Sequence, residues 1–365
     1  MSLRTPRLAG AAVVAALLTG CAASQPEPRS ASCLPADRAL PITVDATGHA
    51  GVELRVMIYN VEGLPWPARK NRGPKLDEIG QELAKLRAAG RAPHIIMTQE
   101  AFTRRAGRIA EAAGYDFTQP GPDRKARRTL AAAEIDPEFM KGRRFGKGEK
   151  IGKRLGSGLN IWSDFPFVRS RAEPFSKNSC AGFDCISNKG ALAAAIAIPG
   201  VPQPVLFITT HINSQGSSGV SPDRRDTAHA YQTAENGMFL EAVRASGEPM
   251  IFGGDFNMRG NRTRFSVFAE TGPFQLVHKV CAQQIVPCDV KLSFDGDEPW
   301  MDTQDLQGYD DGSIVRIRPT RIEAMFDGGD LPMLADHDGQ MVTYRLSWDP
   351  AKAGAAAPTL PGCTA

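Results

Sequence analysis

The sequence of 365 residues predicts an α/β domain built from stacked layers of strands and helices. Apolar runs typical of strands alternate along the chain with two clear helical patterns. Several runs, such as "PVLFITTHIN" over 204–213, are almost continuously apolar, which indicates strands buried on one or both faces. Since no shift in composition marks a second domain, we predict one domain over 51–350, with a tether over 22–50 and a tail over 351–365.

The individual elements are predicted from periodicity and from signals at their ends. The first helix, over 75–90, has apolar residues at positions i, i+3, i+7 and i+10, and Gly90 follows as a stop signal. The second, over 221–245, begins with Ser221 as N-cap and Pro222 in its first turn. Strands are predicted over 54–64, 94–100, 156–167, 190–200, 204–213, 250–252 and 340–346.

The first 21 residues resemble a bacterial secretion signal. Arg4 and Arg7 precede a short apolar stretch, and "LTGC" then ends at Cys21 in the order of a lipobox. We therefore expect residues 1–21 to be a lipoprotein signal with Cys21 lipid-modified. The protein would then be exported and anchored to the membrane of the bacterial envelope, in the outer membrane if the cell is Gram-negative. The alternative is a plain cleaved signal with an incidental cysteine.

Six cysteines lie beyond this signal, an even number that suits disulfides in an exported chain. Six cysteines allow fifteen connectivities, so other pairings stay open. Zinc is disfavoured, because no CxxC pair or nearby histidine completes a ligand set. Spacing favours three pairs, Cys180 with Cys185, Cys281 with Cys288, and Cys33 with Cys363 across the termini.

The charge of the chain is unevenly distributed. A net charge of only +3 argues against a general nucleic-acid binder. Between Arg124 and Arg154 there are eleven Lys or Arg and four acids, within a segment over 120–156 that we expect to be a long loop. The acidic, glycine-containing segment 293–313 is expected to be a loop as well.

Polar residues suited to metal or phosphate chemistry stand at five strand ends. Each has an ordinary explanation alone, such as a turn or a solvated loop. Five such ends in one chain indicate a shared site. The residues are Asn60, Glu100, His211, Asp255 with Asn257, and, just before the last strand, Asp336 with His337.

Together these residues resemble the endonuclease/exonuclease/phosphatase superfamily, which has the fold of deoxyribonuclease I. The matching pieces, in chain order, are "YNVEGL", "TQE", "TTHIN", "GGDFN" and "ADHDG". The resemblance implies a four-layered α/β-sandwich with two packed, mainly antiparallel sheets and the site at one end. It implies an enzyme that hydrolyses phosphoric esters with a divalent metal. A non-catalytic surface lipoprotein is disfavoured, because Glu100 and His337 are both present.

The resemblance also implies a metal site. Glu100 is expected to hold Mg²⁺, or else Mn²⁺ or another divalent cation, with Asn60 in support. Asp255 would position the attacking water or a second metal. Gly253 and Gly254 are expected to let the strand end approach the bound phosphate and metal, where a Cβ would crowd.

Acid–base and phosphate-binding roles follow in the same way. His337 is expected to be a neutral general base for the attacking water, with Asp336 orienting it. Asn257 and His211 would bind the phosphate, and His211 would also assist the leaving oxygen. The superfamily's aspartate before the penultimate strand has no clear counterpart, and Glu323 is the nearest candidate.

The substrate is suggested by a local pattern. Residues 176–190, "SKNSCAGFDCISNKG", resemble the cysteine-containing loop before "NKG" in bacterial sphingomyelinases, with Lys189 facing a phosphate or a membrane. We therefore favour a phosphodiester with a lipid headgroup over nucleic acid, cleaved by a monomeric enzyme of sphingomyelinase or phospholipase C type. An extracytoplasmic nuclease is the alternative. The basic cluster over 124–154 can hold anionic headgroups, track a DNA backbone or be a solvated loop.

Overall fold

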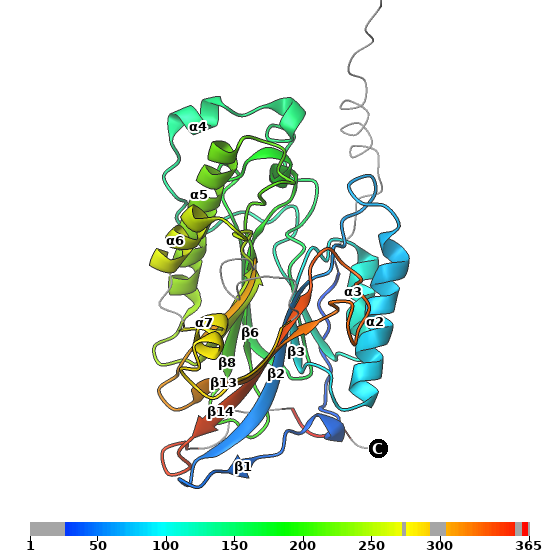
Figure 1. The fold of residues 1–365 in the computed structure, drawn as a ribbon, viewed down its shortest axis with the longest axis vertical. Helices are drawn as coiled ribbons and strands as arrows, with labels where there is room; N and C mark the ends of the chain where they lie inside the picture. Colours follow the sequence, from blue (N-terminus) through cyan, green and yellow to red (C-terminus); the bar gives the residue numbers. More distant parts are fainter. Residues whose placement is uncertain (1–25, 272–274, 293–303, 355–359, 364–365) are drawn as a thin grey trace, which may run out of the picture.

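The computed structural model of the protein describes residues 26–271, 275–292, 304–354 and 360–363. Two sheets pack face to face and helices cover their outer faces, so the chain forms four layers (Figure 1). The predicted α/β-sandwich is therefore confirmed. The expected signal and its Cys21 lie outside the described residues. Within those residues, no helix is long and apolar enough to cross a membrane.

The first sheet has eight strands in the order β11-β13-β14-β2-β3-β5-β4, with β1 paired to β2. β2 and β3 run parallel, so Asn60 and Gln99 end side by side at one edge. The helices α2, Arg72–Ala88, and α3, Arg104–Ala112, cover its outer face (Figure 1). The strands are β1 Thr43–Val44, β2 Ala50–Asn60, β3 Ile95–Gln99, β4 Phe117–Pro120, β5 Asn160–Ser163, β11 Asp289–Lys291, β13 Arg316–Met325 and β14 Gly339–Trp348.

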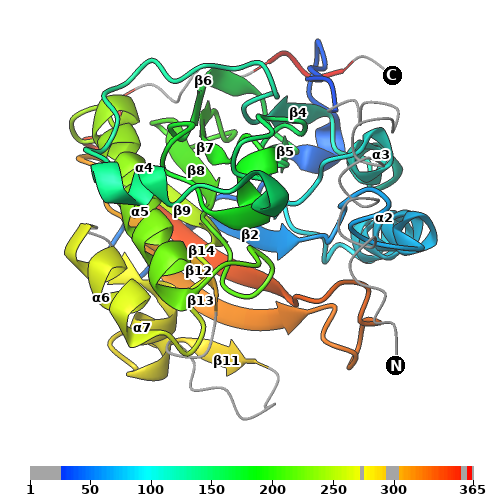
Figure 2. The same cartoon turned by 90° about the horizontal axis from the view of Figure 1, so that it is seen from above.

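The second sheet has six strands in the order β10-β12-β9-β8-β7-β6. β8 and β9 run parallel, which sets His211 opposite Asp255. The helices α5 Pro222–Val243, α6 Arg262–Thr271 and α7 Val277–Ala282 lie on the side away from α2 and α3 (Figure 2). The strands are β6 Phe167–Pro174, β7 Gly190–Ile196, β8 Val205–His211, β9 Met250–Asp255, β10 Gln275–Leu276 and β12 Asp305–Asp310.

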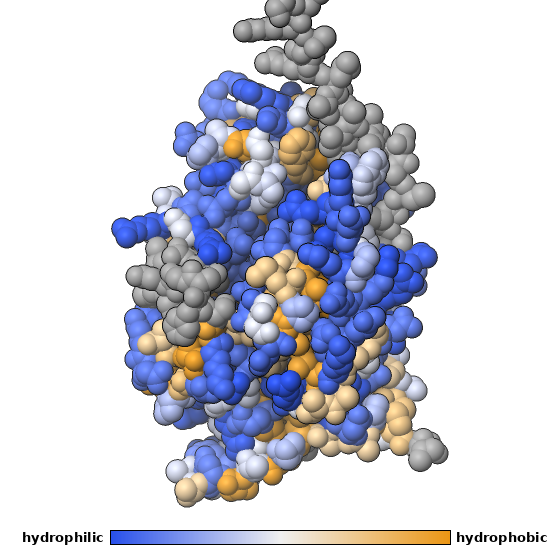
Figure 3. Space-filling model, turned by 45° about the vertical axis from the view of Figure 1, so that its right-hand side comes forward, coloured by the Kyte–Doolittle hydropathy of each residue, from blue (hydrophilic) through white to orange (hydrophobic). Residues whose placement is uncertain are grey.

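The main core lies between the two sheets and is built from the continuously apolar runs of the sequence. Ile58, Phe207 and Ile251 are completely buried there. A run with both faces apolar suits this position, because the inner face meets the other sheet and the outer face meets helices. The surface by contrast is largely hydrophilic on the face shown in Figure 3, with hydrophobic side chains gathered in separate patches.

The two glycines of "GGDFN" serve this packing. A Cβ on Gly253 would lie 2.7 Å from Ile58 Cγ2 in the opposite sheet. A Cβ on Gly254 would lie 2.2 Å from the carbonyl oxygen of Thr210 on β8. The expected reason, close approach of a bound phosphate and metal, is therefore wrong, since protein atoms already require glycine at both positions.

The segment expected to be a tether packs on the domain. Arg29 pairs with Thr118 of β4, Leu34 is buried, and Cys33 is bonded to Cys363. The segment predicted as a tether over 22–50 is thus attached to the domain from residue 29 onwards. All three favoured disulfides are present, the other two being Cys180–Cys185 and Cys281–Cys288.

Two predicted loops contain regular structure. The basic segment holds the short helix α4, Pro137–Lys141, and the turn η2, Phe145–Lys147, and Glu149 ties it to Arg224 of α5 with a 2.6 Å ion pair. The acidic segment ends in β12, which pairs with β9 from Asp305 onwards. The prediction of a loop over the whole of 293–313 is therefore wrong. Because β12 begins at Asp305, this residue lies opposite Asp255 of β9. The remaining short turns are η1, Ala36–Arg38, and η3, Gly182–Ile186.

Candidate active site

The polar strand ends meet at one end of the sandwich. Asn60, His211 and Asp255 are the last residues of β2, β8 and β9. His211 and Asp255 line a pocket of about 330 Å³. We refer to the polar lining residues of this pocket as its floor and to the apolar ones as its wall. Lining residues with polar side chains include Glu100, Asp184, Lys189, His211, Asp255, Asn257 and His337, and the apolar ones include Leu64, Phe102, Leu155, Phe183 and Ile186.

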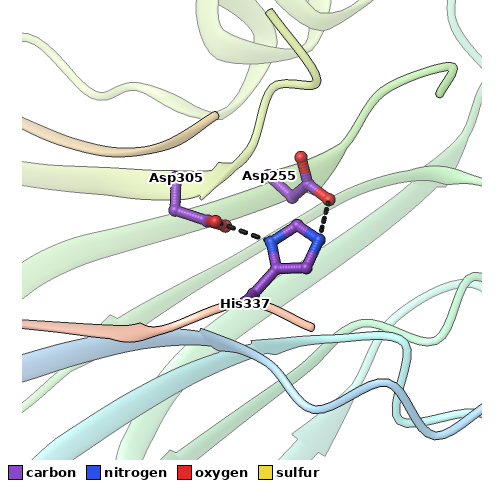
Figure 4. A group of neighbouring side chains, drawn as sticks. All are labelled: Asp255, Asp305 and His337. Atoms are coloured by element: carbon purple, nitrogen blue, oxygen red, sulfur yellow. Dashed lines mark hydrogen bonds and ion pairs between the residues drawn. The ribbon is translucent and has the colours of Figure 1, made fainter. Parts of the chain in front are cut away.

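His337 lies between two carboxylates from the second sheet (Figure 4). Its Nδ1 is 2.7 Å from Asp305 Oδ2, and its Nε2 is 3.8 Å from Asp255 Oδ2. Asp336, predicted to orient the imidazole, instead pairs with Arg69 at 3.1 Å and is half-exposed. That prediction is wrong, because the carboxylate of Asp336 is engaged by Arg69 and the Nδ1 of His337 is engaged by Asp305. Asp305 is the orienting residue.

The surroundings of His337 favour its charged form. Burial alone would lower the pKa of His337, but the carboxylates of Asp305 and Asp255 outweigh burial and raise it to about 10. These carboxylates therefore favour the imidazolium over the neutral imidazole that the sequence suggested. Burial raises the pKa of Asp255 to about 7. The carboxyl of Asp255 is thus a candidate proton acceptor, and His337 is a candidate proton donor.

Contacts across the two sheets hold the site together. Asn60 Nδ2, from the first sheet, donates to Asp255 Oδ2 of the second at 3.1 Å. Its Oδ1 accepts the backbone N–H of Glu62 at 3.1 Å, which fixes the orientation of the amide. The contact between His337 and Asp305 also joins the sheets. Because both contacts are buried, a small change in the spacing of the sheets would break them.

His211 belongs to a second buried group. Lys189 Nζ lies 3.0 Å from His211 Nε2, and burial, then the Lys189 charge, hold the pKa of His211 well below its usual range. Asp184 Oδ1 neutralises Lys189 at 2.6 Å. Lys189 is buried within the pocket, so it can meet a phosphate, and the alternative that it faces a membrane is wrong. Asp184 was missed, although it stands between Cys180 and Cys185, whose disulfide ties down its turn.

Asn257 takes the left-handed conformation, with φ of 50°, and its N–H donates to Asp255 Oδ1 at 2.9 Å. Its Nδ2 donates to the carbonyl of Ile212 at 3.2 Å. The buried guanidinium of Arg264 in α6 donates to the Asn257 carbonyl at 2.7 Å and pairs with Asp226 of α5. The loop after β9 is therefore fixed from both sides, and Asp255 and Asn257 both line the pocket as expected.

Glu100 can hold a metal ion. Its Oε2 is buried and has no hydrogen-bond partner among the described residues, and burial raises its pKa. A buried carboxylate oxygen without a donor costs free energy that a hard divalent cation would recover. Asp255, Asp305 and His337 also have ligand atoms within 4.8 Å of one another. His337 and Asp305 already satisfy each other at 2.7 Å, so Glu100 fits a metal better.

Glu323, the candidate for the missing aspartate, lies elsewhere. It is on β13, where it pairs with Arg321, and it lines a separate cavity beside Phe326. Asp305 fills the place beside His337 that Glu323 was proposed to fill. The short run "LQGY" after Asp305 is too mixed in residue type to mark the start of a strand.

A buried histidine held by a carboxylate, an unsatisfied carboxylate and a group of phosphate donors at strand ends define a phosphoester hydrolase site. The family comparison agrees. The chain belongs to the endonuclease/exonuclease/phosphatase family, whose model matches residues 57–312. The protein is therefore a metal-dependent phosphoric ester hydrolase. No match was found among curated protein sequences.

Solved structures with the same fold come from several kinds of enzyme. A beta toxin variant from Staphylococcus aureus with bound magnesium ions is 14% identical, with a TM-score of 0.51, and the match covers 81% of this chain and 99% of that one. Sphingomyelinase C from Streptomyces griseocarneus is 18% identical, with a TM-score of 0.52 and coverage of 80% and 99%. A mannosyl-6-phosphatase from Bacteroides thetaiotaomicron is 15% identical, with 0.51 and coverage of 80% and 99%. At these identities the likeness shows the fold alone.

Proposed function

We propose that the protein is an exported phosphodiesterase that cleaves the headgroup ester of a phospholipid, as a sphingomyelinase or phospholipase C does. The observation that carries this proposal is the apolar wall of the pocket. Leu64, Phe102, Leu155, Phe183 and Ile186 lie beside the polar floor. A substrate with an apolar group next to its phosphodiester would bury that group there, whereas the deoxyribose beside a DNA phosphodiester offers less apolar surface to bury.

The residues of the floor suggest how the ester is hydrolysed. Asp255 takes the proton from the attacking water, since its pKa of about 7 leaves a carboxylate available at neutral pH. His337, held as an imidazolium by Asp305, donates to a phosphoryl oxygen and stabilises the charge that develops there. This assignment reverses the role that the sequence suggested for His337.

The remaining donors bind the phosphate. Asn257 and the pair of Lys189 and His211 line the same pocket. Assistance to the leaving oxygen is the further role proposed for His211. Glu100 would hold the divalent metal, with Asn60 beside it, and Mg²⁺ is the ion we propose, with Mn²⁺ as the alternative. A metal there would neutralise negative charge on the phosphoryl oxygens and the leaving group.

The cellular location is part of the proposal. The lipobox-like "LTGC" supports a lipid on Cys21, and three disulfides suit an oxidising compartment. We propose that the monomeric enzyme is anchored to the bacterial envelope, in the outer membrane if the cell is Gram-negative. Labelling of the protein by radioactive palmitate, lost in a Cys21→Ser variant, would support this. An unlabelled wild-type protein would exclude it.

The alternative is an extracytoplasmic nuclease, and the basic segment is the feature that favours it. Several of its cations, however, are engaged with the protein itself. Arg128 donates to the carbonyls of Ala131 and Pro174, and Arg143 to the carbonyl of Lys177. Cations that bind carbonyls of the protein stabilise its fold and are not available to bind the phosphates of a nucleic acid.

The deciding experiment compares products on two substrates. The enzyme is incubated with Mg²⁺ and either sphingomyelin liposomes or duplex DNA. Release of phosphocholine without nicking of DNA would support the lipid reaction. Nicking without phosphocholine release would establish the nuclease instead. A His337→Ala variant serves as the control for contaminating activity, because it should lose about 10²-fold or more of the true rate.

A further inference from the structure

We propose that the rim of the pocket is a membrane-contact surface that lays the active-site opening on an anionic bilayer. The surface consists of Trp66 and Phe145 with the basic residues next to them, and we refer to it as the aromatic rim. The proposal names a second point of attachment beside the N-terminal lipid. The role of this surface in catalysis rests on the proposed lipid substrate, whereas membrane binding itself is measured without hydrolysis.

Trp66 is the largest exposed apolar side chain near the pocket. It is 66% exposed, in the loop between β2 and α2. Leu64 and Ala68, two residues to either side, line the pocket, so the loop that carries Trp66 runs along the pocket's edge. Lys70, two residues further on, is exposed as well. Trp is favoured where an apolar body meets lipid and a polar N–H meets the headgroups, and a lysine beside it can pair with anionic headgroups.

Phe145 lies in a turn that comes close to the pocket wall from a different part of the chain. It is 60% exposed, in the turn η2. Gly148, whose N–H donates to the Phe145 carbonyl at 3.0 Å, packs against Phe183 and Ile186 of the pocket wall. Phe145 is therefore one turn from that wall. A soluble monomer seldom exposes aromatic side chains from two separate segments around one opening unless they bind something.

The charge around these aromatics fits an anionic lipid surface. Arg144 and Lys150 are exposed on either side of η2, and the one acid nearby, Glu149, is buried in its ion pair with Arg224. Residues 64–71 carry two cations and no acid. Arg69 is paired with Glu62 and Asp336, so Lys70 is the cation of this loop that we expect to face the lipid. Cations beside exposed aromatics are the combination that attracts a protein to anionic lipid and then holds it by apolar insertion.

Pro26, the first described residue, and the loop of Trp66 lie against the same helix, α3. Pro26 lies against Gly107 of α3, where a Cβ would be 2.6 Å from the Pro26 Cβ. The loop of Trp66 packs on the same helix, through Gly63 against Ala106. Five residues from Cys21 to Pro26 span at most roughly 18 Å. A lipid on Cys21 would thus hold this side of the molecule close to the bilayer.

Vesicle binding tests the proposal. The mature chain from residue 21 with Cys21→Ser, which carries neither the apolar signal nor the lipid, is sedimented with vesicles of phosphatidylglycerol and phosphatidylcholine. Trp66→Ala and Phe145→Ala should each lower the partition coefficient, Trp66→Ala by about tenfold or more, because each removes a large apolar group from the interface. Ile285→Ala is the matched control, since Ile285 is similarly exposed, at 59%, in the turn after α7.

A second readout follows Trp66 itself. Trp162 and Trp348 are buried, so a blue shift of the emission on adding vesicles that disappears in Trp66→Phe would report insertion of this indole. Hydrolysis of soluble bis-p-nitrophenyl phosphate should stay at the wild-type rate in Trp66→Ala. Wild-type partition by both rim variants, or no binding by the parent chain, would overturn the proposal. Binding through Trp66 without any phosphocholine release would overturn the proposed substrate and leave the membrane surface standing.

Discussion

The contact between His337 and Asp305 gives the sharpest prediction. The two side chains are about nine-tenths buried and lie 2.7 Å apart. A buried, charge-assisted hydrogen bond contributes about 1.5–3 kcal/mol. Asp305→Asn keeps the shape and an oxygen that can accept from Nδ1 but removes the charge. If the pair stabilises the transition state, kcat/KM should fall about 10- to 150-fold, at one factor of ten for each ~1.4 kcal/mol.

The matched control is Asp336→Asn. Asp336 is 47% exposed and pairs with Arg69, which is 38% exposed, so the pair contributes at most about 1 kcal/mol. Its removal should lower kcat/KM by less than about fivefold. Both variants are assayed with Mg²⁺ on bis-p-nitrophenyl phosphate, and their melting temperatures are compared with that of the wild type to separate catalysis from folding.

Two results would refute this reasoning. The first is a wild-type rate for Asp305→Asn, which would mean that the carboxylate does not act through His337. The second is an equal loss in Asp336→Asn, which would restore the residue that the sequence suggested. If the fall in kcat/KM of Asp305→Asn is accounted for by a lower melting temperature, Asp305 has a structural role alone.

Three further predictions follow from other features. Glu100→Gln should abolish the rise in melting temperature on adding Mg²⁺, and EDTA should stop wild-type hydrolysis until Mg²⁺ is restored; a wild-type response of the variant would remove Glu100 from the metal site. Folding raises the pKa of His337 from 6.5 to about 10. The contribution of His337 to the free energy of unfolding is therefore complete below about pH 6.5 and is lost as the pH rises through about 10. The free energies of unfolding of wild type and His337→Gln, measured with denaturant, should differ most at the acid end of that window. Cys33→Ser should lower the free energy of unfolding by about 2–5 kcal/mol, measured with urea, since the bond closes a loop of 330 residues; Cys21→Ser should leave it unchanged.

Much of the site could be predicted from the sequence because its residues follow apolar strands. Asn60, Glu100, His211 and Asp255 each end a run whose burial is visible in the residue types alone. Parallel neighbours then bring such ends to one edge, as β2 and β3 do, and β8 and β9. The family resemblance supplied the order in which these pieces combine.

Asp305 could not be found in the same way. It begins β12, a strand whose "DLQGYD" mixes acids, a buried glutamine and a glycine, so no apolar run announces it. Its place is set by pairing with β9, fifty residues earlier in the chain. A polar residue such as Gln307 would not be expected in a buried strand. It is buried here because its amide donates to the carbonyls of Val56 and Gln340 in the other sheet. Only long-range pairing makes such a segment a strand.

Gly253 and Gly254 affect the order in which activity and secondary structure are lost when the enzyme denatures. They let the two sheets and two neighbouring strands approach closely at the level of the site, where Asn60 and Asp255 join across the gap. A partly denatured state that keeps its strands but lets the sheets separate would still give a nearly native far-UV circular dichroism spectrum. It would have no phosphoesterase activity, because the contacts of Asn60 with Asp255 and of His337 with Asp305 cross that gap. Loss of activity should therefore precede loss of secondary structure on acid or mild denaturant treatment, so turnover is a more sensitive measure of sheet docking than spectroscopy.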